Sequence, residues 1–70
     1  MKADRRDRAE RSARIVRVRR EFEGGSALTV GDVARRSGLA RDVCWRILCE
    51  LEDDNVLELT WDGRFTLRGA

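Results

Sequence analysis

Five arginines are the residues whose type and position point most directly to a chemistry. Arg35 and Arg36 lie near the end of one predicted helix, Arg41 and Arg46 lie in the next, and Arg64 lies beside a predicted turn. Guanidinium groups bind phosphates and guanine edges in a bidentate manner. The set predicts contacts with a polyanion, although each residue could also be a solvated surface arginine.

The side chains that catalysis or metal binding would need are scarce. The chain has no His, the commonest general base. Its two cysteines, Cys44 and Cys49, are five positions apart in a predicted helix, which places them roughly 140° apart around the axis. They neither pair nor form a zinc-binding Cys-x-x-Cys motif. We expect no enzyme activity, no metal and no cofactor.

Length and composition limit the class of protein further. The chain has 70 residues, of which 40% are charged and 41% are hydrophobic, as in one small domain with a modest core. It is too short for a TIM barrel or a complete dinucleotide-binding fold. It lacks the ~18-residue apolar stretch of a membrane span, and its charged start does not resemble a signal peptide. The expected location is cytoplasmic, without membrane contact.

The net charge of +2 hides an uneven distribution. Residues 1–20 carry nine basic and three acidic side chains, whereas residues 21–70 carry six arginines and ten acids. A basic segment of this kind is typical of an arm that binds a polyanion. Its charges could instead form a solvated helix face, because three acid–arginine pairs have the favourable i,i+4 spacing. These pairs are Asp4–Arg8, Asp7–Arg11 and Glu10–Arg14.

Apolar periodicity predicts the first helix and divides the chain. Ile15, Val18 and Phe22 form one stripe of a helix that we expect over residues 4–23, before a Gly-Gly-Ser run. Few apolar residues precede this stripe. We therefore predict a basic N-terminal segment, residues 1–11, which is frayed or extends the first helix, and a folded domain, residues 12–70.

A second, short helix is predicted from its end signals. Thr29 and Asp32 have the spacing of a capping box, and Leu28 and Val33 stand where a hydrophobic staple would form. Gly38 is suited to the left-handed conformation that follows a last turn. The helix between these signals has about two turns.

The third helix and a hairpin complete the pattern. An apolar stripe with helical spacing predicts a helix over about residues 40–54, and its members are Cys44, Ile47, Leu48 and Leu51. Asn55 can end this helix in a left-handed conformation. Over residues 56–68 the apolar period changes to two, and Asp62-Gly63 predicts a type I′ hairpin turn. The expected fold class is mainly α with a small β-hairpin (α+β).

This order of elements resembles a winged helix-turn-helix DNA-binding domain, in which a hairpin, the wing, follows the second helix of the unit. The runs Val-Ala-Arg-Arg-Ser-Gly-Leu at residues 33–39 and Arg-Ile-Leu-Cys-Glu-Leu-Glu at 46–52 are similar to those of IclR-type transcriptional regulators. The wing of those domains closes on a run like Asp-Gly-Arg-Phe-Thr-Leu at 62–67. The resemblance covers about residues 12–69.

The resemblance implies a protein that binds double-stranded DNA at specific sequences, either as a small transcriptional regulator or as a mobile-element factor. The helix at 40–54 would enter the major groove, and the hairpin at 56–68 would be the wing. The residues expected at DNA are Arg35, Arg36, Arg41, Asp42, Trp45, Arg46 and Arg64. No small-molecule ligand is implied, because the chain has no counterpart of the ligand-binding domain of IclR-type regulators.

Several of these residues have other roles open to them. Arg46 could read a guanine or hold a phosphate, or it could pair with Asp42 or Glu50 along its own helix. Trp45 could contact DNA or cover the seam between helices. Asp42 stands where such families usually have Ser or Thr; its carboxylate could accept from a cytosine amino group or favour the helix start. Val43 is likewise apolar where a polar residue is usual.

Two apolar residues predict an interaction surface. Val16 lies off the apolar stripe of the first helix, and Trp61 lies beside the tip of the hairpin. We expect a homodimer through the first helix, because a core of this size is small for a stable monomer. A winged-helix module that binds protein and not DNA is the alternative function. Trp61 and the acidic balance of residues 21–70 favour that alternative.

Overall fold

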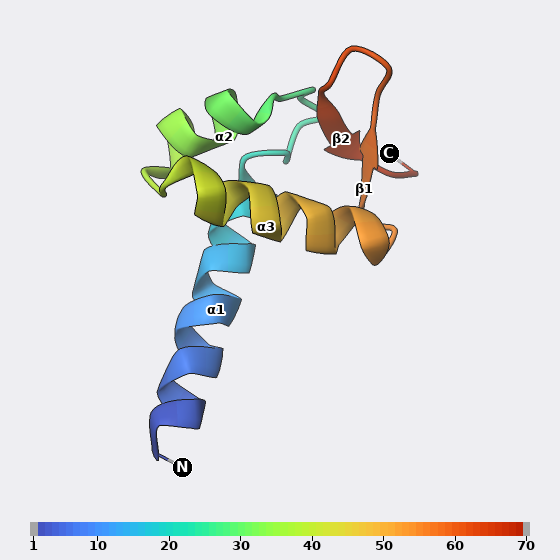
Figure 1. The fold of residues 1–70 in the computed structure, drawn as a ribbon. Coiled ribbons are helices and arrows are strands. Elements are labelled where there is room, and N and C mark those ends of the chain that lie inside the picture. Colours follow the sequence, from blue (N-terminus) through green and yellow to red (C-terminus); the bar gives the residue numbers. More distant parts are fainter. Residues whose placement is uncertain (1, 70) are drawn as a thin grey trace.

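The structure, a computed structural model, describes residues 2–69 and gives side-chain positions from residue 8 onward. Its elements are helices α1 (Lys2–Arg20), α2 (Val30–Ser37) and α3 (Arg41–Asp53) and strands β1 (Leu57–Leu59) and β2 (Phe65–Leu67). The N-terminal half of α1 projects from the other elements, α3 crosses near its C-terminal half, and α2 and the hairpin lie at the far end (Figure 1). The expected α+β architecture, a winged helix-turn-helix, is confirmed.

Helix α1 ends at Arg20, three residues before the predicted end at Glu23. Phe22 lies in the turn that follows, where its N–H donates to the carbonyl of Arg19 over 3.0 Å. These shorter-range bonds tighten the chain and still bury Phe22 completely. Gly24 then takes a left-handed φ of 95°, as expected of a helix stop. The predicted pairs Asp4–Arg8 and Asp7–Arg11 lie outside the described side chains.

The end signals of α2 act as predicted. The Thr29 hydroxyl accepts from the Asp32 N–H, and an Asp32 carboxylate oxygen accepts from the Thr29 N–H, both over 3.1 Å. Leu28 and Val33 are both buried, as the predicted staple requires. Gly38 has φ 75° and ends the helix. The capping box thereby satisfies two backbone donors at the start of a helix too short to be stable by itself.

Helix α3 buries the predicted stripe of Cys44, Ile47, Leu48 and Leu51. Asn55 has φ 62°, and its N–H donates to Glu52 over 3.0 Å. The next N–H, of Val56, donates to Leu51 over 2.9 Å. This Schellman arrangement ends the helix and turns the chain into the hairpin.

The hairpin has the predicted antiparallel pairing but a different turn. Its last strand pair is Leu59 with Phe65, and Thr60 donates to the Arg64 carbonyl over 2.7 Å. Gly63 donates back to the Thr60 carbonyl over 3.1 Å and has φ 81°, whereas Asp62 keeps a negative φ. The predicted type I′ turn is therefore wrong. The tip is a three-residue loop in which Gly63 alone takes the left-handed position.

Residue Leu28 adds a third, minimal strand to the hairpin. Its N–H donates to the Phe65 carbonyl over 3.0 Å, and Phe65 donates to Leu28 over 2.7 Å. Both side chains are buried in a core that draws on all the elements. Its buried residues are Val18, Phe22, Leu28, Val33, Cys44, Ile47, Leu48, Leu51, Leu57 and Phe65. Within residues 2–69, no helix is both long and apolar enough to cross a membrane.

Candidate nucleic-acid interface

The residues predicted at DNA lie on three elements, and those on α3 are divided between its two sides. Arg35 and Arg36 lie on α2, Arg64 lies beside the wing tip, and the other four lie on α3. Every one of the seven residues is exposed. On α3, the side towards α2 carries Arg41, Asp42 and Trp45, whereas Arg46 lies on the side towards α1. The predicted residues of α3 therefore line two neighbouring depressions.

The two α2 arginines differ in what holds them. Arg35 forms an ion pair with Asp32 over 2.7 Å, which ties it to the capping box. The pKa of Asp32 is lowered, first by its hydrogen bonds with Thr29 and then by Arg35. Arg36 takes part in no ion pair among the side chains described. Of the two, Arg36 is therefore the one more available to an external anion.

The α2 side of α3 forms an open depression. Val30 of α2 and three α3 residues, Arg41, Asp42 and Trp45, line it. Trp45 is 50% exposed, and its ring meets that of Phe65 edge to face, with centroids 6.2 Å apart. The indole thus covers the joint between α3 and the hairpin and keeps half of its surface available. Both roles predicted for Trp45 are compatible with this position.

The α1 side of α3 forms a groove of about 490 Å³. Its lining residues are Glu10, Arg11 and Arg14 from α1 and Val43, Arg46, Ile47 and Glu50 from α3. Arg11 pairs with Glu50, and this hydrogen bond lowers the pKa of the carboxyl. Arg46 pairs with neither Asp42 nor Glu50. The ion pair of Arg46 along α3, one of the roles left open by the sequence, is therefore absent among the described side chains, and Glu50 pairs with Arg11 of α1 instead.

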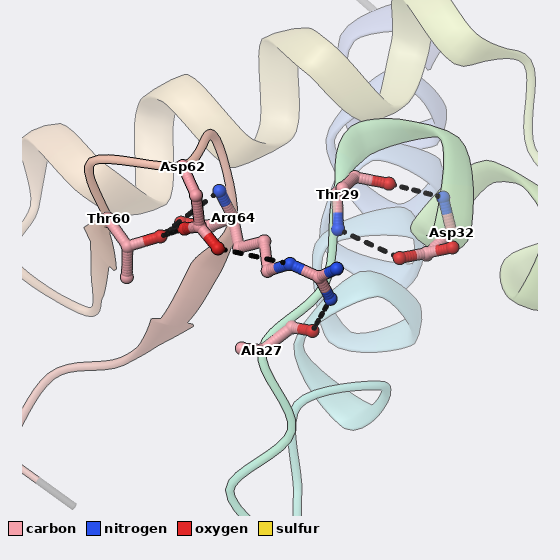
Figure 2. A network of polar contacts seen from close by, with 6 residues as sticks. All are labelled: Ala27, Thr29, Asp32, Thr60, Asp62 and Arg64. Carbon is pink, nitrogen blue, oxygen red and sulfur yellow. Dashed lines mark hydrogen bonds and ion pairs between the residues drawn. The ribbon is translucent and has the colours of Figure 1, made fainter.

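Arg64 is built into the wing (Figure 2). Its guanidinium lies 3.3 Å from the Asp62 carboxylate and donates to the Ala27 carbonyl over 3.4 Å. Its backbone N–H donates to the Thr60 hydroxyl over 3.2 Å. The Thr60 hydroxyl in turn donates to Asp62 and lowers the pKa of that carboxyl. Arg64 thus joins the wing tip to the segment that precedes α2, and a DNA contact remains a prediction.

Sequence reasoning missed two partners in this network. Ala27 contributes only a backbone carbonyl, so no side-chain pattern could reveal it. Thr60 did carry a signal, because Thr hydroxyls beside turns can hydrogen-bond nearby backbone groups, as that of Thr60 does with Arg64. The network links the wing tip to the segment that precedes α2.

The two apolar residues predicted as an interaction surface are exposed. The side chain of Trp61 is 98% exposed because Trp61 occupies the turn itself, beyond the last strand pair. Val16 is 54% exposed and lies on α1 away from the core. Exposure of this kind is a requirement for an interaction surface, and their role remains a prediction.

The thiols and carboxylates of the described residues provide no second chemistry. Within residues 8–69, no three His, Cys, Asp or Glu side chains gather as metal ligands would. Cys44 is buried in the core, as predicted. Partial burial, together with Asp53 and Glu52, raises the pKa of the Cys49 thiol and makes it a poor nucleophile at neutral pH.

Comparison with solved structures gives a match for this arrangement. The crystal structure of an IclR homolog from Microbacterium sp. strain HM58-2 matches 83% of this chain with a TM-score of 0.75, and the two sequences are 32% identical. The chain spans 25% of the length of that protein. No protein-family model and no curated protein matches the sequence. The chain is a winged helix-turn-helix domain similar to that of IclR-type transcriptional regulators.

Proposed function

We propose that this protein binds double-stranded DNA at specific sequences and acts in transcription regulation. The observation that carries the proposal is a helix-turn-helix whose second helix, α3, exposes Arg41, Asp42 and Trp45 within a fold similar to that of an IclR homolog. A protruding helix of this size fits the major groove. A role in a mobile element remains a narrower form of the same proposal. We propose no catalytic activity, and the cytoplasm remains the predicted location.

In the proposed mechanism, α3 enters the major groove through its N-terminal half. Arg41, Asp42 and Trp45 face the bases, and Arg36 on α2 contacts the backbone. The acidic residues at the other end of α3 lie away from the groove. The wing, which Arg64 links to the segment before α2, approaches the neighbouring backbone or minor groove with Trp61 at its tip.

The proposed assembly is a homodimer in which α1 of each protomer contributes Val16. Two copies would place their α3 helices in successive major grooves, about one DNA turn apart. Because an apolar contact dominates this proposed interface, Val16→Glu should dissociate the dimer and high salt should only weaken it. Sedimentation equilibrium over a concentration series tests it. A single species near the monomer mass of 8.0 kDa at about 100 μM would contradict the homodimer.

DNA binding is tested with the full chain and two kinds of duplex. Selection from a random duplex library should enrich one sequence, and binding to random duplex should weaken steeply between roughly 50 and 200 mM salt. Arg36→Ala should weaken binding to all sequences alike and flatten the plot of log affinity against log salt by ~0.9. If the protein binds no duplex at low salt, the winged domain is a protein-interaction module instead.

A further inference from the structure

We propose that the groove between α1 and α3 holds one phosphate of the DNA backbone between Arg14 and Arg46. This inference rests on the proposed function, and it assigns Arg46 to the backbone and not to a base. It also gives α1 a direct part in binding DNA. The two arginines come from different helices and are 32 positions apart in the sequence, yet they line the same groove.

The residues that line the groove carry more positive than negative charge. Arg11, Arg14 and Arg46 face it together with Glu10 and Glu50. Arg11 and Glu50 form an ion pair, so their charges neutralise each other. The pairing raises the pKa of Arg11 and lowers that of Glu50.

Arg14 and Arg46 take part in no ion pair with the side chains described, residues 8–69. Although Glu10 lies four residues before Arg14, the two form no ion pair. Two guanidinium groups on one groove repel each other, and an anion between them removes that repulsion. Guanidinium forks also match phosphate oxygens in geometry.

Two apolar residues also line the groove, next to the arginines that would bind the anion. Val43 and the edge of the buried Ile47 contribute apolar surface beside Arg46. The groove is open and its arginines are exposed, so this apolar surface strengthens their interactions only modestly. This position accounts for Val43, which stands where similar domains usually have a polar residue.

On α3, Arg46 lies on the α1 flank of the exposed face, roughly 140° around the helix axis from Arg41 and roughly 40° from Asp42. Arg41, Asp42 and Trp45 line the depression on the α2 side, whereas Arg46 lines the groove on the α1 side. When a helix lies in the major groove, its flanks face the two backbones and its protruding edge faces the bases. An arginine on the α1 flank, next to a second arginine from α1, is therefore placed for phosphate.

The Arg11–Glu50 ion pair supports this site in two ways. It joins α1 to α3 one helical turn before Arg14, so it holds the two walls of the groove together. It also neutralises the carboxylate that would otherwise repel a phosphate.

The test measures the salt dependence and the sequence preference of the full chain with Arg14→Ala, Arg46→Ala and the double variant. Each single variant should lose roughly three- to tenfold in affinity, equally for the selected and the random duplex. Since both arginines hold the same phosphate, the double variant should flatten the salt dependence by ~0.9 in total and not by twice that amount. Circular dichroism should show unchanged folding, because both side chains are exposed.

Two matched variants serve as controls. Arg17→Ala removes an arginine one turn further along α1 that shares a second depression with Arg14 but does not line the groove between α1 and α3, so it should leave the salt dependence unchanged. Arg46→Lys keeps the charge without the fork, so it should keep the salt dependence and recover part of the affinity.

Three results would overturn the clamp while leaving the proposed function intact. The first is an altered base preference in Arg46→Ala, which would make Arg46 a base reader. The second is full affinity in Arg14→Ala. The third is a loss of about two phosphates in the double variant, which would assign the two arginines to separate sites. A wild-type chain that binds no duplex would overturn both proposals.

Discussion

The two halves of α1 meet the rest of the molecule in opposite ways. The C-terminal half packs Val18 completely into the core, with Ile15 beside it, and leads directly to the buried Phe22. The N-terminal half projects from the body, and its described side chains from residue 8 to residue 14 are all exposed (Figure 1). One ion pair, Arg11–Glu50, joins that half to α3. A single helix is thus held by burial at one end and by charge at the other.

This difference shows how the protein divides stability from proposed function. Apolar burial gives about 25 cal/mol per Å², so the residues that pack in the core carry the stability of a domain this small. Exposed ion pairs contribute little to stability and are screened by salt. The projecting arginines are therefore free to serve a partner with charge, and changes to them should leave the fold intact.

The largest effect should come from Phe22→Ala at the packed end. Removing a completely buried aromatic side chain costs about 3–5 kcal/mol, which equals the whole stability expected of a small core. The variant should lose its cooperative thermal transition in circular dichroism. The matched change at the projecting end, Arg8→Ala, should alter the free energy of unfolding by less than about 0.5 kcal/mol. Equal effects of the two changes would contradict the difference between the packed and the projecting half of α1.

A smaller loss of stability is expected from removing a polar contact within the folded domain, the cap of α2. Thr29→Ala removes the hydroxyl that caps α2 and should destabilise the domain by about 1 kcal/mol. Thr29→Ser keeps the hydroxyl and should restore most of that loss. Urea denaturation followed by circular dichroism measures both variants. A loss as large as that of Phe22→Ala would show that caps, and not burial, dominate the stability of the body.

Deletion of residues 1–11 should have a smaller effect still. The deletion removes the Arg11–Glu50 ion pair and none of the residues of the described core. We expect a cooperative melt with its midpoint only a few degrees lower, together with a weaker, less salt-dependent interaction with DNA. Loss of the cooperative transition would mean that the segment packs on the domain or on a partner.

The smallest effect is the pH dependence of the ion pair between the two regions. Hydrogen bonding to Arg11 lowers the pKa of Glu50 below its unfolded value of 4.5. A lowered pKa means that the pair stabilises the fold fully above that value and loses its effect as the pH falls through the folded pKa. The difference in melting temperature between wild type and Arg11→Ala should therefore be present at neutral pH and disappear in acid. A difference that persists below both pKa values would assign Arg11 another role.

Sequence reasoning was most accurate where a signal and its structural effect lie within a few residues. The capping box of Thr29 and Asp32, the left-handed Gly38 and Asn55, and the buried stripe of α3 are all confirmed. Each depends on local backbone geometry or on helical periodicity. The same local reasoning put the end of α1 three residues too late and predicted the wrong type of turn for the hairpin. In both places the chain adopts another local geometry: i→i−3 hydrogen bonds replace the last turn of α1, and a three-residue loop replaces the two-residue turn of the hairpin.

The candidate site shows this limit more clearly than the fold. The identities of the exposed arginines, and the elements that carry them, could be predicted from the chain. Their grouping could not, because the angle at which α1 crosses α3 decides that Arg46 lies with Arg14 and not with Arg41. The partner of Arg11 was equally hidden. Among the side chains that the structure describes, Arg11 pairs with Glu50, which is 39 positions away in the sequence.

By itself, the sequence determined the order of elements, the helix-turn-helix with its wing, and the residues that form the core, because periodicity and capping are local properties. The tertiary structure alone decided which charged residues share a surface. The pairing of Leu28 with the hairpin and the contact of Arg64 with Ala27 both require that the segment before α2 lies beside the wing. These contacts depend on the packing angles of whole elements, which many distant side chains set together and which no short stretch of sequence encodes.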